Sequence, residues 1–140
     1  MDLEKLKEIR STKSPFARRL GIVVEEIRPG YARATMVVTG EETNSYGTVH
    51  GGCCYTLADV ATGAACGSYG IKSMTASASY NYLGKGHEGD TLTAVAEERK
   101  QGKHLGVYDV SIKNQEGKLL GTGTFTYYML DQPIFPENIT

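Results

Sequence analysis

Residues 50–66 read HGGCCYTLADVATGAAC, and from 53 to 66 Asp59 is the only charged side chain. A run of this length without proline exceeds a typical strand, and Gly67 and Gly70 follow it as stop signals. The pattern therefore predicts a helix over 53–66. Because its residues are apolar on nearly all sides, this helix should be buried.

Strand-like segments flank this helix on both sides. The two before it cover 21–27 and 31–38, and Arg28-Pro29-Gly30 between them supplies a turn, which predicts a hairpin. Four more candidate strands follow the helix, over 73–83, 91–100, 104–113 and 118–129. Their connecting loops are short and contain glycine, at 84–90, 101–103 and 114–117. Short loops of this kind predict antiparallel pairing of consecutive strands.

The order of these elements predicts an α+β domain. A short amphipathic helix over 2–9 comes first, then two strands, the buried helix and four more strands. An antiparallel sheet of about six strands that curls around the one helix would bury both partners. One helix cannot cover a whole sheet, so the remaining area also predicts an obligate dimer.

The length of 140 residues fits one domain over 1–140. Its core is expected at about 16–130, and the tail after Asp131, which holds two prolines, is expected to be a loosely held end. The first ten residues do not resemble a signal peptide, and no apolar run approaches the roughly 20 residues that span a bilayer. We therefore expect a cytoplasmic protein.

Composition argues against several classes of partner. The net charge is −1 with Lys and Arg scattered along the chain, which argues against nucleic acid and against a membrane surface. Cys53, Cys54 and Cys66 make an odd count without a CxxC pair, so neither a disulfide framework nor a structural zinc is expected. We expect small buried thiols in a reducing cytosol instead.

Asp59 is the most informative residue for function. It lies between Leu57-Ala58 and Val60-Ala61, and an unpaired carboxylate in such surroundings costs several kcal/mol. One interpretation is a carboxylate that faces a solvent-filled gap between packed elements or forms an ion pair with an arginine. The other, which we favour, is a carboxylate kept in a cleft as nucleophile or general base.

The start of the predicted helix supplies a second candidate element of a site. Gly51 and Gly52 place free N–H groups at the positive end of the helix dipole, which suits a developing oxyanion, although glycines also open helices for structural reasons alone. Asp59 lies eight residues beyond Gly51, which is about 12 Å along a helix and roughly 80° around it. If both groups are catalytic, the site is shared by two chains whose helices run antiparallel about a twofold axis.

The motif Asn44-x-x-Gly47-x-x-His50-Gly51-Gly52, followed by Leu57-Ala58-Asp59, resembles the PaaI-like group of hotdog-fold thioesterases. The stretches 81–83, 89–92 and 117–121 are also similar to that family, and the resemblance runs from about Phe16 to Met129. It implies a hotdog fold and hydrolysis of CoA thioesters. It implies no metal and no cofactor, because coenzyme A is part of the substrate. It also implies homodimers that pair into homotetramers.

The resemblance implies roles for single residues. Gly51 would donate its backbone N–H to the thioester carbonyl, and Asp59 would act as nucleophile or general base. Asn44 would help place the substrate or the attacking water, and His50 would shape the loop and contact the thioester region. The family often has Ser or Thr on the strand facing the acid, and the best matches here are Thr75 and then Ser77.

Further positions are expected to bind the substrate. Gly47 and Gly52 belong to the same motif. Lys85 keeps a positive charge where many relatives carry a basic residue and then proline. The segment Gln101-Gly102-Lys103 resembles the hairpin that borders the nucleotide in relatives. Its lysine and Lys100 are candidate phosphate partners, with ordinary solvated lysines as the other interpretation.

Other reactive and aromatic side chains are assigned to the surface or to packing. His87 and His104 lie in or beside loops without metal-like spacing. The adjacent cysteines at 53 and 54 lack a sequence-evident base that would make one a nucleophile. Four tyrosines on the predicted strands are expected to pack, with one lining the acyl pocket as an alternative: Tyr80, Tyr82, Tyr127 and Tyr128.

Three functions are compatible with these residues. The first is an acyl-CoA thioesterase acting on aromatic (phenylacetyl-type) or medium-chain acyl-CoA. The second is a hotdog hydratase or dehydratase, which would need His50 and Asp59 as a proton-transfer pair. The third is an acyl-CoA-binding protein without turnover. We favour the thioesterase because it uses Asp59, Gly51 and Asn44 together.

Overall fold

The computed structural model describes residues 1–135 and contains three α-helices, one 3₁₀ turn and six strands in that part of the chain. The helices are α1 (Leu3–Thr12), α2 (Pro15–Arg19) and α3 (Gly51–Gly67), and the 3₁₀ turn is η1 (Gly40–Glu42). The strands are β1 (Val23–Arg28), β2 (Tyr31–Val37), β3 (Ile71–Tyr82), β4 (Thr91–Gln101), β5 (Leu105–Lys113) and β6 (Leu119–Pro133).

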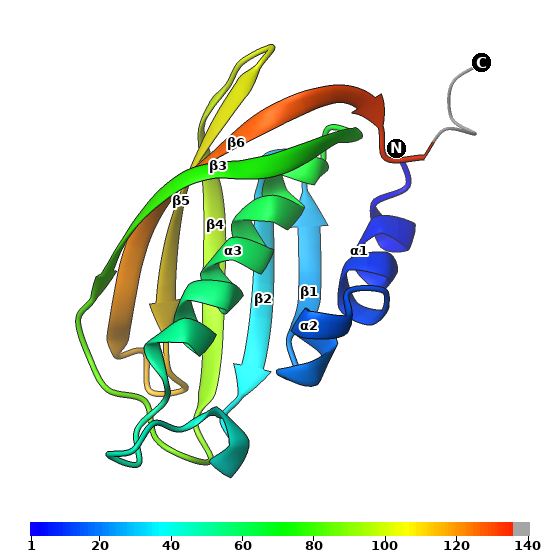
Figure 1. Ribbon diagram of the computed structural model, residues 1–140. Coiled ribbons are helices and arrows are strands. Elements are labelled where there is room, and N and C mark those ends of the chain that lie inside the picture. Colours follow the sequence, from blue (N-terminus) through cyan, green and yellow to red (C-terminus); the bar gives the residue numbers. More distant parts are fainter. Residues whose placement is uncertain (136–140) are drawn as a thin grey trace.

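The strands form one antiparallel sheet in the order β1-β2-β4-β5-β6-β3, and the sheet curves around α3 (Figure 1). The predicted α+β architecture, a six-stranded sheet around one long buried helix, is confirmed. The fold is the hotdog arrangement that the resemblance implies. The core lies between α3 and the inner face of the sheet, where alternate strand residues point inward.

The small residues of α3 allow this close packing. Leu57, Ala58, Ala61 and Ala65 have no exposed surface, because they pack between α3 and the surrounding elements. Alanine brings the backbone of α3 near the strands while keeping high helix propensity. As predicted, the helix is buried on nearly all sides, and it begins two residues earlier than expected, at Gly51.

The position of β3 differs from the expected pairing of consecutive strands. β3 pairs with β6 at the edge of the sheet, whereas β4 lies between β2 and β5. The loop 84–90 therefore does not close a hairpin. Its backbone groups bond elsewhere: the Val49 N–H donates to Gly86 O at 2.8 Å, and the Val38 N–H donates to Asp90 O at 2.9 Å. A short loop with glycine forms a hairpin only when the two strands that it connects pair with each other. Here both sides of β4 are already paired, with β2 and with β5.

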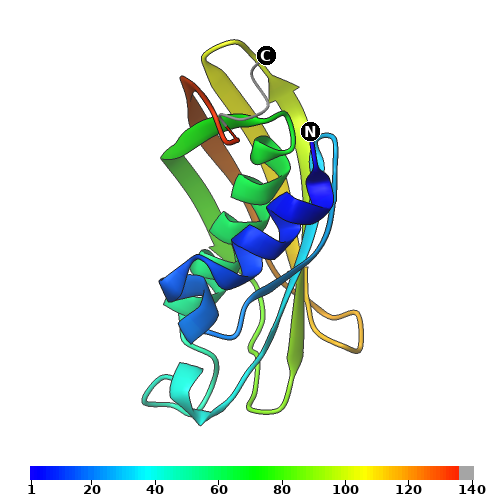
Figure 2. The ribbon, with the colours of Figure 1, turned by 90° about the vertical axis from the view of Figure 1, so that its right-hand side faces the viewer.

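The N-terminal segment forms two helices where the sequence indicated one. α1 ends at Thr12, and Pro15 occupies the first turn of α2, a position where a missing N–H costs nothing. α1 lies beside β1 with Leu6 buried, and Figure 2 shows it on the same side of the sheet as α3. The two helices also pack against α3 on that side.

The chain beyond Asp131 is held more firmly than expected as far as residue 135. β6 continues to Pro133, the Ile134 N–H donates to Gly70 O at 2.8 Å, and the Phe135 side chain is buried. The rest of the predicted loose tail lies outside the described residues. Over 1–135, no helix has the length and apolar character needed to cross a membrane.

Candidate active site

Asp59 lies in the middle of α3, where its half-buried side chain leaves the core and meets β3 and β6. Its Oδ1 accepts a hydrogen bond from Thr75 Oγ1 at 2.8 Å and another from the Tyr127 hydroxyl at 2.7 Å. Within residues 1–135, Oδ2 accepts no hydrogen bond. Two O–H donors thus fix one carboxylate oxygen and leave the other available for water or substrate.

The pairing of β3 with β6 brings the two donors together. Thr75 and Tyr127 are direct partners in the register of these strands, so their side chains project from the same face of the sheet toward α3. Thr75 is the residue that the resemblance places opposite the acid, and the structure puts it in contact with Asp59. Its participation in catalysis remains a prediction.

Tyr127 is a site residue that the sequence analysis assigned to packing. Its ring is buried, and burial together with the Asp59 charge holds the pKa of Tyr127 well above its ordinary value of 10.0, so the hydroxyl stays protonated and donates. The Thr62 hydroxyl lies 2.7 Å from it and helps to orient it. Its alternation with Phe125 and Met129, which are also buried, is a signal that could have pointed it inward, but no sequence signal placed β6 beside β3.

A cavity of about 240 Å³ opens beside Asp59, between α1, α3 and β3. It is lined by Arg10, Ser14, Ala17, Asp59, Val60, Gly63, Ser73, Met74, Thr75 and Tyr127. Arg10 was not among the predicted site residues, because it lies just beyond the amphipathic helix predicted over 2–9 and belongs to none of the motifs. Burial lowers the pKa of Arg10, while the nearby Tyr127, Cys66 and Asp59 act in the opposite direction.

The start of α3 carries the predicted donor, Gly51. His50 is the N-cap, and its Nδ1 accepts the Gly52 N–H at 2.8 Å, which places the proton of the neutral ring on Nε2. In the described part of the chain, the Gly51 N–H has no hydrogen-bond acceptor. The Tyr82 hydroxyl donates to Gly51 O at 3.2 Å, and a Cβ at residue 51 would lie 3.0 Å from its ring. One free N–H thus remains at the positive end of the helix dipole.

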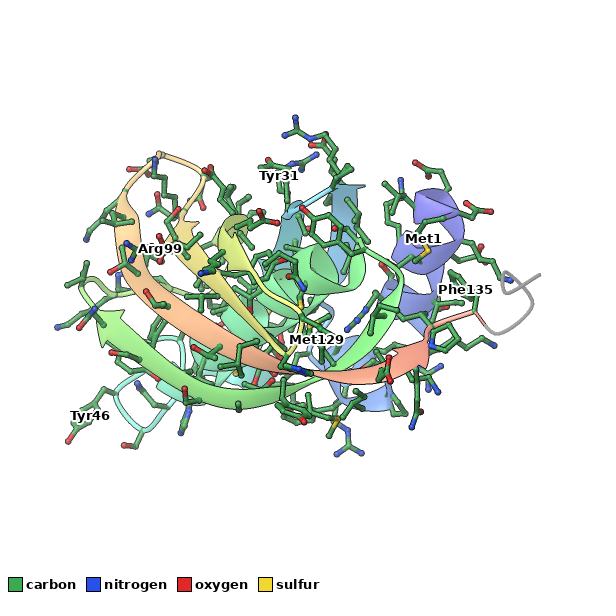
Figure 3. All side chains as sticks on the ribbon, turned by 90° about the horizontal axis from the view of Figure 1, so that it is seen from above. Met1, Tyr31, Tyr46, Arg99, Met129 and Phe135 are labelled. Atoms are coloured by element: carbon green, nitrogen blue, oxygen red, sulfur yellow. The ribbon has the colours of Figure 1, made fainter. Side chains whose placement is uncertain are left out.

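Asn44 shapes the loop that precedes this helix. Its Oδ1 accepts the N–H groups of Tyr46 and Thr48 at 2.9 and 3.2 Å, and its Nδ2 donates to Thr48 Oγ1 at 2.9 Å. Gly47 supplies the turn with φ of 81°. Tyr46 at the tip of the loop points away from the body of the molecule (Figure 3). In one chain, the Asn44 side chain therefore bonds within its own loop and does not contact Asp59.

The other predicted binding residues are spread over the molecule. Ser77 is a register partner of Thr126 beyond a bulge after Thr75, so it projects from the opposite face of the sheet. Lys85 is exposed near the start of α3, next to the Val49–Gly86 contact. Gly102 and Lys103 lie in the β4–β5 turn near the C-terminal end of α3, where Gln101 contacts Cys66. One chain alone does not bring these residues together.

The three cysteines do not suit nucleophilic attack. Burial raises the pKa of Cys53 and of Cys66, and it raises the pKa of Cys54 to about 11, so all three remain thiols near neutral pH. All three side chains are buried and free of disulfides. Among residues 1–135, no three His, Cys, Asp or Glu side chains lie close enough together to hold a metal ion.

Comparisons with known proteins agree with this geometry. Residues 46–120 match the family model of the thioesterase superfamily. The chain is 42% identical to acyl-coenzyme A thioesterase PaaI of Escherichia coli K12 over 102 residues, which cover 73% of each chain. It is 33% identical to human acyl-coenzyme A thioesterase 13 over 118 residues, which cover 81% of this chain and 84% of the human protein.

Solved structures show the same relationship. The structure of E. coli PaaI superimposes with a TM-score of 0.90 at 33% identity and covers 94% of this chain and 95% of that one. A hypothetical thioesterase protein of Streptococcus pneumoniae TIGR4, solved with coenzyme A, superimposes with a TM-score of 0.77 at 37% identity, over 80% of this chain and 90% of that one.

The fold and the matched family define the class: this chain belongs to the thioesterase superfamily. Its similarity to the bacterial and human enzymes also shows that it is an acyl-CoA thioesterase of the type of PaaI and acyl-coenzyme A thioesterase 13.

Proposed function

We propose that the chain hydrolyses aromatic (phenylacetyl-type) or medium-chain acyl-CoA to the free acid and CoA, with Asp59 as the catalytic carboxylate. The observation that carries this proposal is the asymmetric environment of Asp59. Its Oδ1 is fixed by two hydroxyl donors, and its Oδ2 is free beside a cavity. A carboxylate that is positioned but only half satisfied can accept a proton from water or attack a carbonyl carbon.

The proposed site is shared between two chains. Within one chain Gly51 and Asp59 are about 12 Å apart along α3, too far to act on one carbonyl. β3 is an edge strand of 12 residues with no neighbour on its outer side in the described chain. Antiparallel pairing of β3 with a second copy would satisfy its unpaired backbone groups and set the two α3 helices antiparallel. Gly51 of one protomer would then face Asp59 of its partner.

In this arrangement the thioester oxygen accepts the Gly51 N–H, and charge on that oxygen grows as the carbonyl carbon becomes tetrahedral. In one route Asp59 Oδ2 takes a proton from water, the water oxygen bonds to the carbonyl carbon, and the C–S bond breaks to release CoA. In the other, Oδ2 bonds to the carbonyl carbon, the C–S bond breaks to release CoA as a thiolate that takes a proton from water, and a water molecule then cleaves the acyl anhydride to the free acid and Asp59. Incorporation of oxygen-18 from water into Asp59 during a single turnover identifies the anhydride route with attack at the aspartyl carbonyl, because the general-base route puts the label only in the free acid.

The same dimer would combine binding residues that one chain separates. With the helices antiparallel, the Lys85 end of one protomer lies near the Gly102–Lys103 end of its partner. Both lysines are exposed and fit a role as phosphate partners for the nucleotide of CoA. The resemblance to relatives supports pairing of two such dimers into a homotetramer.

The position of His50 argues against the hydratase alternative. Its Nδ1 is occupied by the Gly52 N–H, and it lies about 13 Å before Asp59 along the helix. A hydratase needs a histidine and an acid close enough to act on neighbouring carbon atoms. Within one chain the two residues do not form that pair, and in the proposed dimer only Nε2 of His50 could act toward Asp59 of the partner, because Nδ1 caps α3.

The test is thiol release from phenylacetyl-, benzoyl-, hexanoyl-, palmitoyl- and crotonyl-CoA by wild type and by Asp59→Asn. We expect wild-type turnover and a fall in kcat of about 100-fold or more in the variant, since removal of a catalytic base or nucleophile typically costs this much. Loss of the crotonyl double bond without thiol release would identify a hydratase. Binding of CoA esters with no reaction of any of them would identify a binding protein.

A further inference from the structure

Arg10 is the residue of the cavity that the reaction above does not use. Its guanidinium rests on α3 at Gly63 and Gly67. A Cβ at residue 67 would lie 2.8 Å from Nη2, and one at residue 63 would lie 3.4 Å from Nη1. Two glycines four residues apart thus leave a recess on one face of the helix, and the guanidinium lies in it.

Arg10 has no hydrogen-bond or ion-pair partner within residues 1–135. Ser14 lines the same cavity as the N-cap of α2, yet its side chain makes no capping hydrogen bond. A desolvated cation without an acceptor is unfavourable unless a ligand supplies one. The Arg10 guanidinium and the Ser14 hydroxyl thus both line the cavity, and neither has a protein acceptor within residues 1–135.

A second cavity of about 330 Å³ continues from the first. It shares Arg10, Ser14, Ser73 and Met74 with it, and it adds Leu6, Ile9, Lys13, Lys72, Leu130 and Ile134. Apart from Asp59 at one end, every charged residue that lines the two cavities is a cation: Arg10, Lys13 and Lys72. The rest of the second lining is mostly apolar, with Leu6, Ile9, Met74, Leu130 and Ile134, so the space suits an acyl group with an aliphatic middle and an anionic end placed at Arg10.

The spacing along α3 sets the length of a matching acyl group. Gly63 and Gly67 lie four and eight residues beyond Asp59, which corresponds to about 6 and 12 Å along the helix axis. An extended six-carbon acyl chain spans roughly 6 Å from its thioester carbon to its last carbon, from C–C bonds of about 1.5 Å. A terminal carboxylate on such a chain would reach the guanidinium while the thioester lies at Asp59.

We propose that Arg10, assisted by Ser14, selects acyl groups that carry a carboxylate at their far end, that is, CoA monothioesters of dicarboxylic acids. This inference rests on the proposed function and names its substrate class. The guanidinium fork matches a carboxylate in a bidentate geometry, and the aliphatic middle of the acyl chain contacts Val60 and Met74 on the way.

The test compares adipoyl-CoA with hexanoyl-CoA, which have the same chain length and differ in the terminal carboxylate. We expect wild type to prefer adipoyl-CoA in kcat/KM. Arg10→Met should lower the ratio of the two kcat/KM values by about 10- to 100-fold, as expected for loss of charged hydrogen bonds. Arg10→Lys, which keeps the charge without the fork, should lose less. Arg18→Met is the matched control, because Arg18 is an exposed arginine outside both cavities and its loss should leave the ratio unchanged.

Two results would overturn the inference. One is a wild-type preference for hexanoyl-CoA. The other is an equal fall for both substrates in Arg10→Met and Arg10→Lys, which would mean that Arg10 acts through Asp59 or through the fold. If wild type hydrolyses neither of these esters nor any ester of the panel above, the proposed function fails, and calorimetric binding then decides the inference separately. Tighter binding of adipoyl-CoA that Arg10→Met abolishes would support it, and equal binding of the two esters would refute it.

Discussion

At the scale of single residues, the two oxygens of Asp59 have unlike surroundings. Oδ1 accepts the hydroxyls of Thr75 and Tyr127, whereas Oδ2 accepts no hydrogen bond from residues 1–135. The two donors hold the carboxylate in one rotamer and orient Oδ2 for reaction. The donors come from two paired strands, and each can be removed by a single substitution.

Tyr127→Phe removes one donor and keeps the ring. Because hydrogen bonds to charged groups contribute about 1.5–3 kcal/mol, we expect kcat/KM to fall by about 10-fold or more. The control is Tyr128→Phe, an exposed tyrosine on the other face of the strand. Equal activity of Tyr127→Phe and wild type in steady-state hydrolysis of hexanoyl-CoA would show that the hydroxyl does not position Asp59.

Thr75 allows a cleaner comparison, because two substitutions of similar size differ in the hydroxyl. Thr75→Ser keeps the donor to Oδ1 and should retain most of the activity. Thr75→Val keeps the shape, loses the donor and should lose about 10-fold in kcat/KM. The same loss in both variants would indicate that the methyl group, and not the hydroxyl, supports the site.

At the scale of elements, α3 carries both halves of the proposed chemistry, with Gly51 at its start and Asp59 in its middle. Its N-terminus depends on His50, whose Nδ1 accepts the Gly52 N–H and leaves the Gly51 N–H free. The neighbouring elements hold this N-terminus in place. The His50 N–H donates to Glu42 O of η1, and the Tyr82 hydroxyl of β3 donates to Gly51 O.

His50→Ala removes this cap and should lower the free energy of unfolding by about 1 kcal/mol. His50→Asn is the matched control, because its side-chain oxygen can accept the same N–H and should retain most of the stability. Urea denaturation monitored by circular dichroism measures both. Equal stability of His50→Ala and wild type would mean that the cap contributes nothing measurable to α3.

At the scale of the whole molecule, the proposed site requires a second copy of the chain. The strand that would carry the contact is β3, which ends the sheet with one side unpaired in the described chain and exposes Met74, Tyr82 and Leu83 nearby. Large apolar side chains along a free strand edge are typical of an interface. Whether residues of two chains form one site can be tested by mixing two variants, each of which carries an inactivating substitution at a different residue of the site.

Gly51→Pro removes the free N–H at a helix position that tolerates proline, and His50 already has the extended conformation that precedes proline. Gly51→Ala is its control, because it keeps the N–H and adds the same Cβ. Neither Gly51→Pro nor Asp59→Asn alone should be active. Random mixing of the two chains should restore about one quarter of the wild-type activity, because half of the dimers are mixed and each has one intact shared site. No recovery in mixed samples of confirmed heterodimers would place both groups in one chain's site.

The local elements and the identity of the central acid follow from the sequence alone. The apolar run that becomes α3, the hairpin of β1 and β2 and the four later strands are all visible as local patterns, because periodicity and turn residues act over a few positions. Asp59 stands out as the one charge in a buried helix. The motif around Asn44 and His50 indicated the family, which the comparisons confirm.

Only the tertiary structure decided which distant residues meet at Asp59. Loop length did not predict that β3 lies beside β6, and this pairing is what brings Tyr127 to Oδ1 and turns Ser77 to the other face beyond a bulge. Arg10 reaches the cavity only because α1 packs next to two glycines of α3. These contacts join segments separated by about fifty or more residues, and their free energy depends on strand order and packing. No local pattern in the sequence encodes either of these.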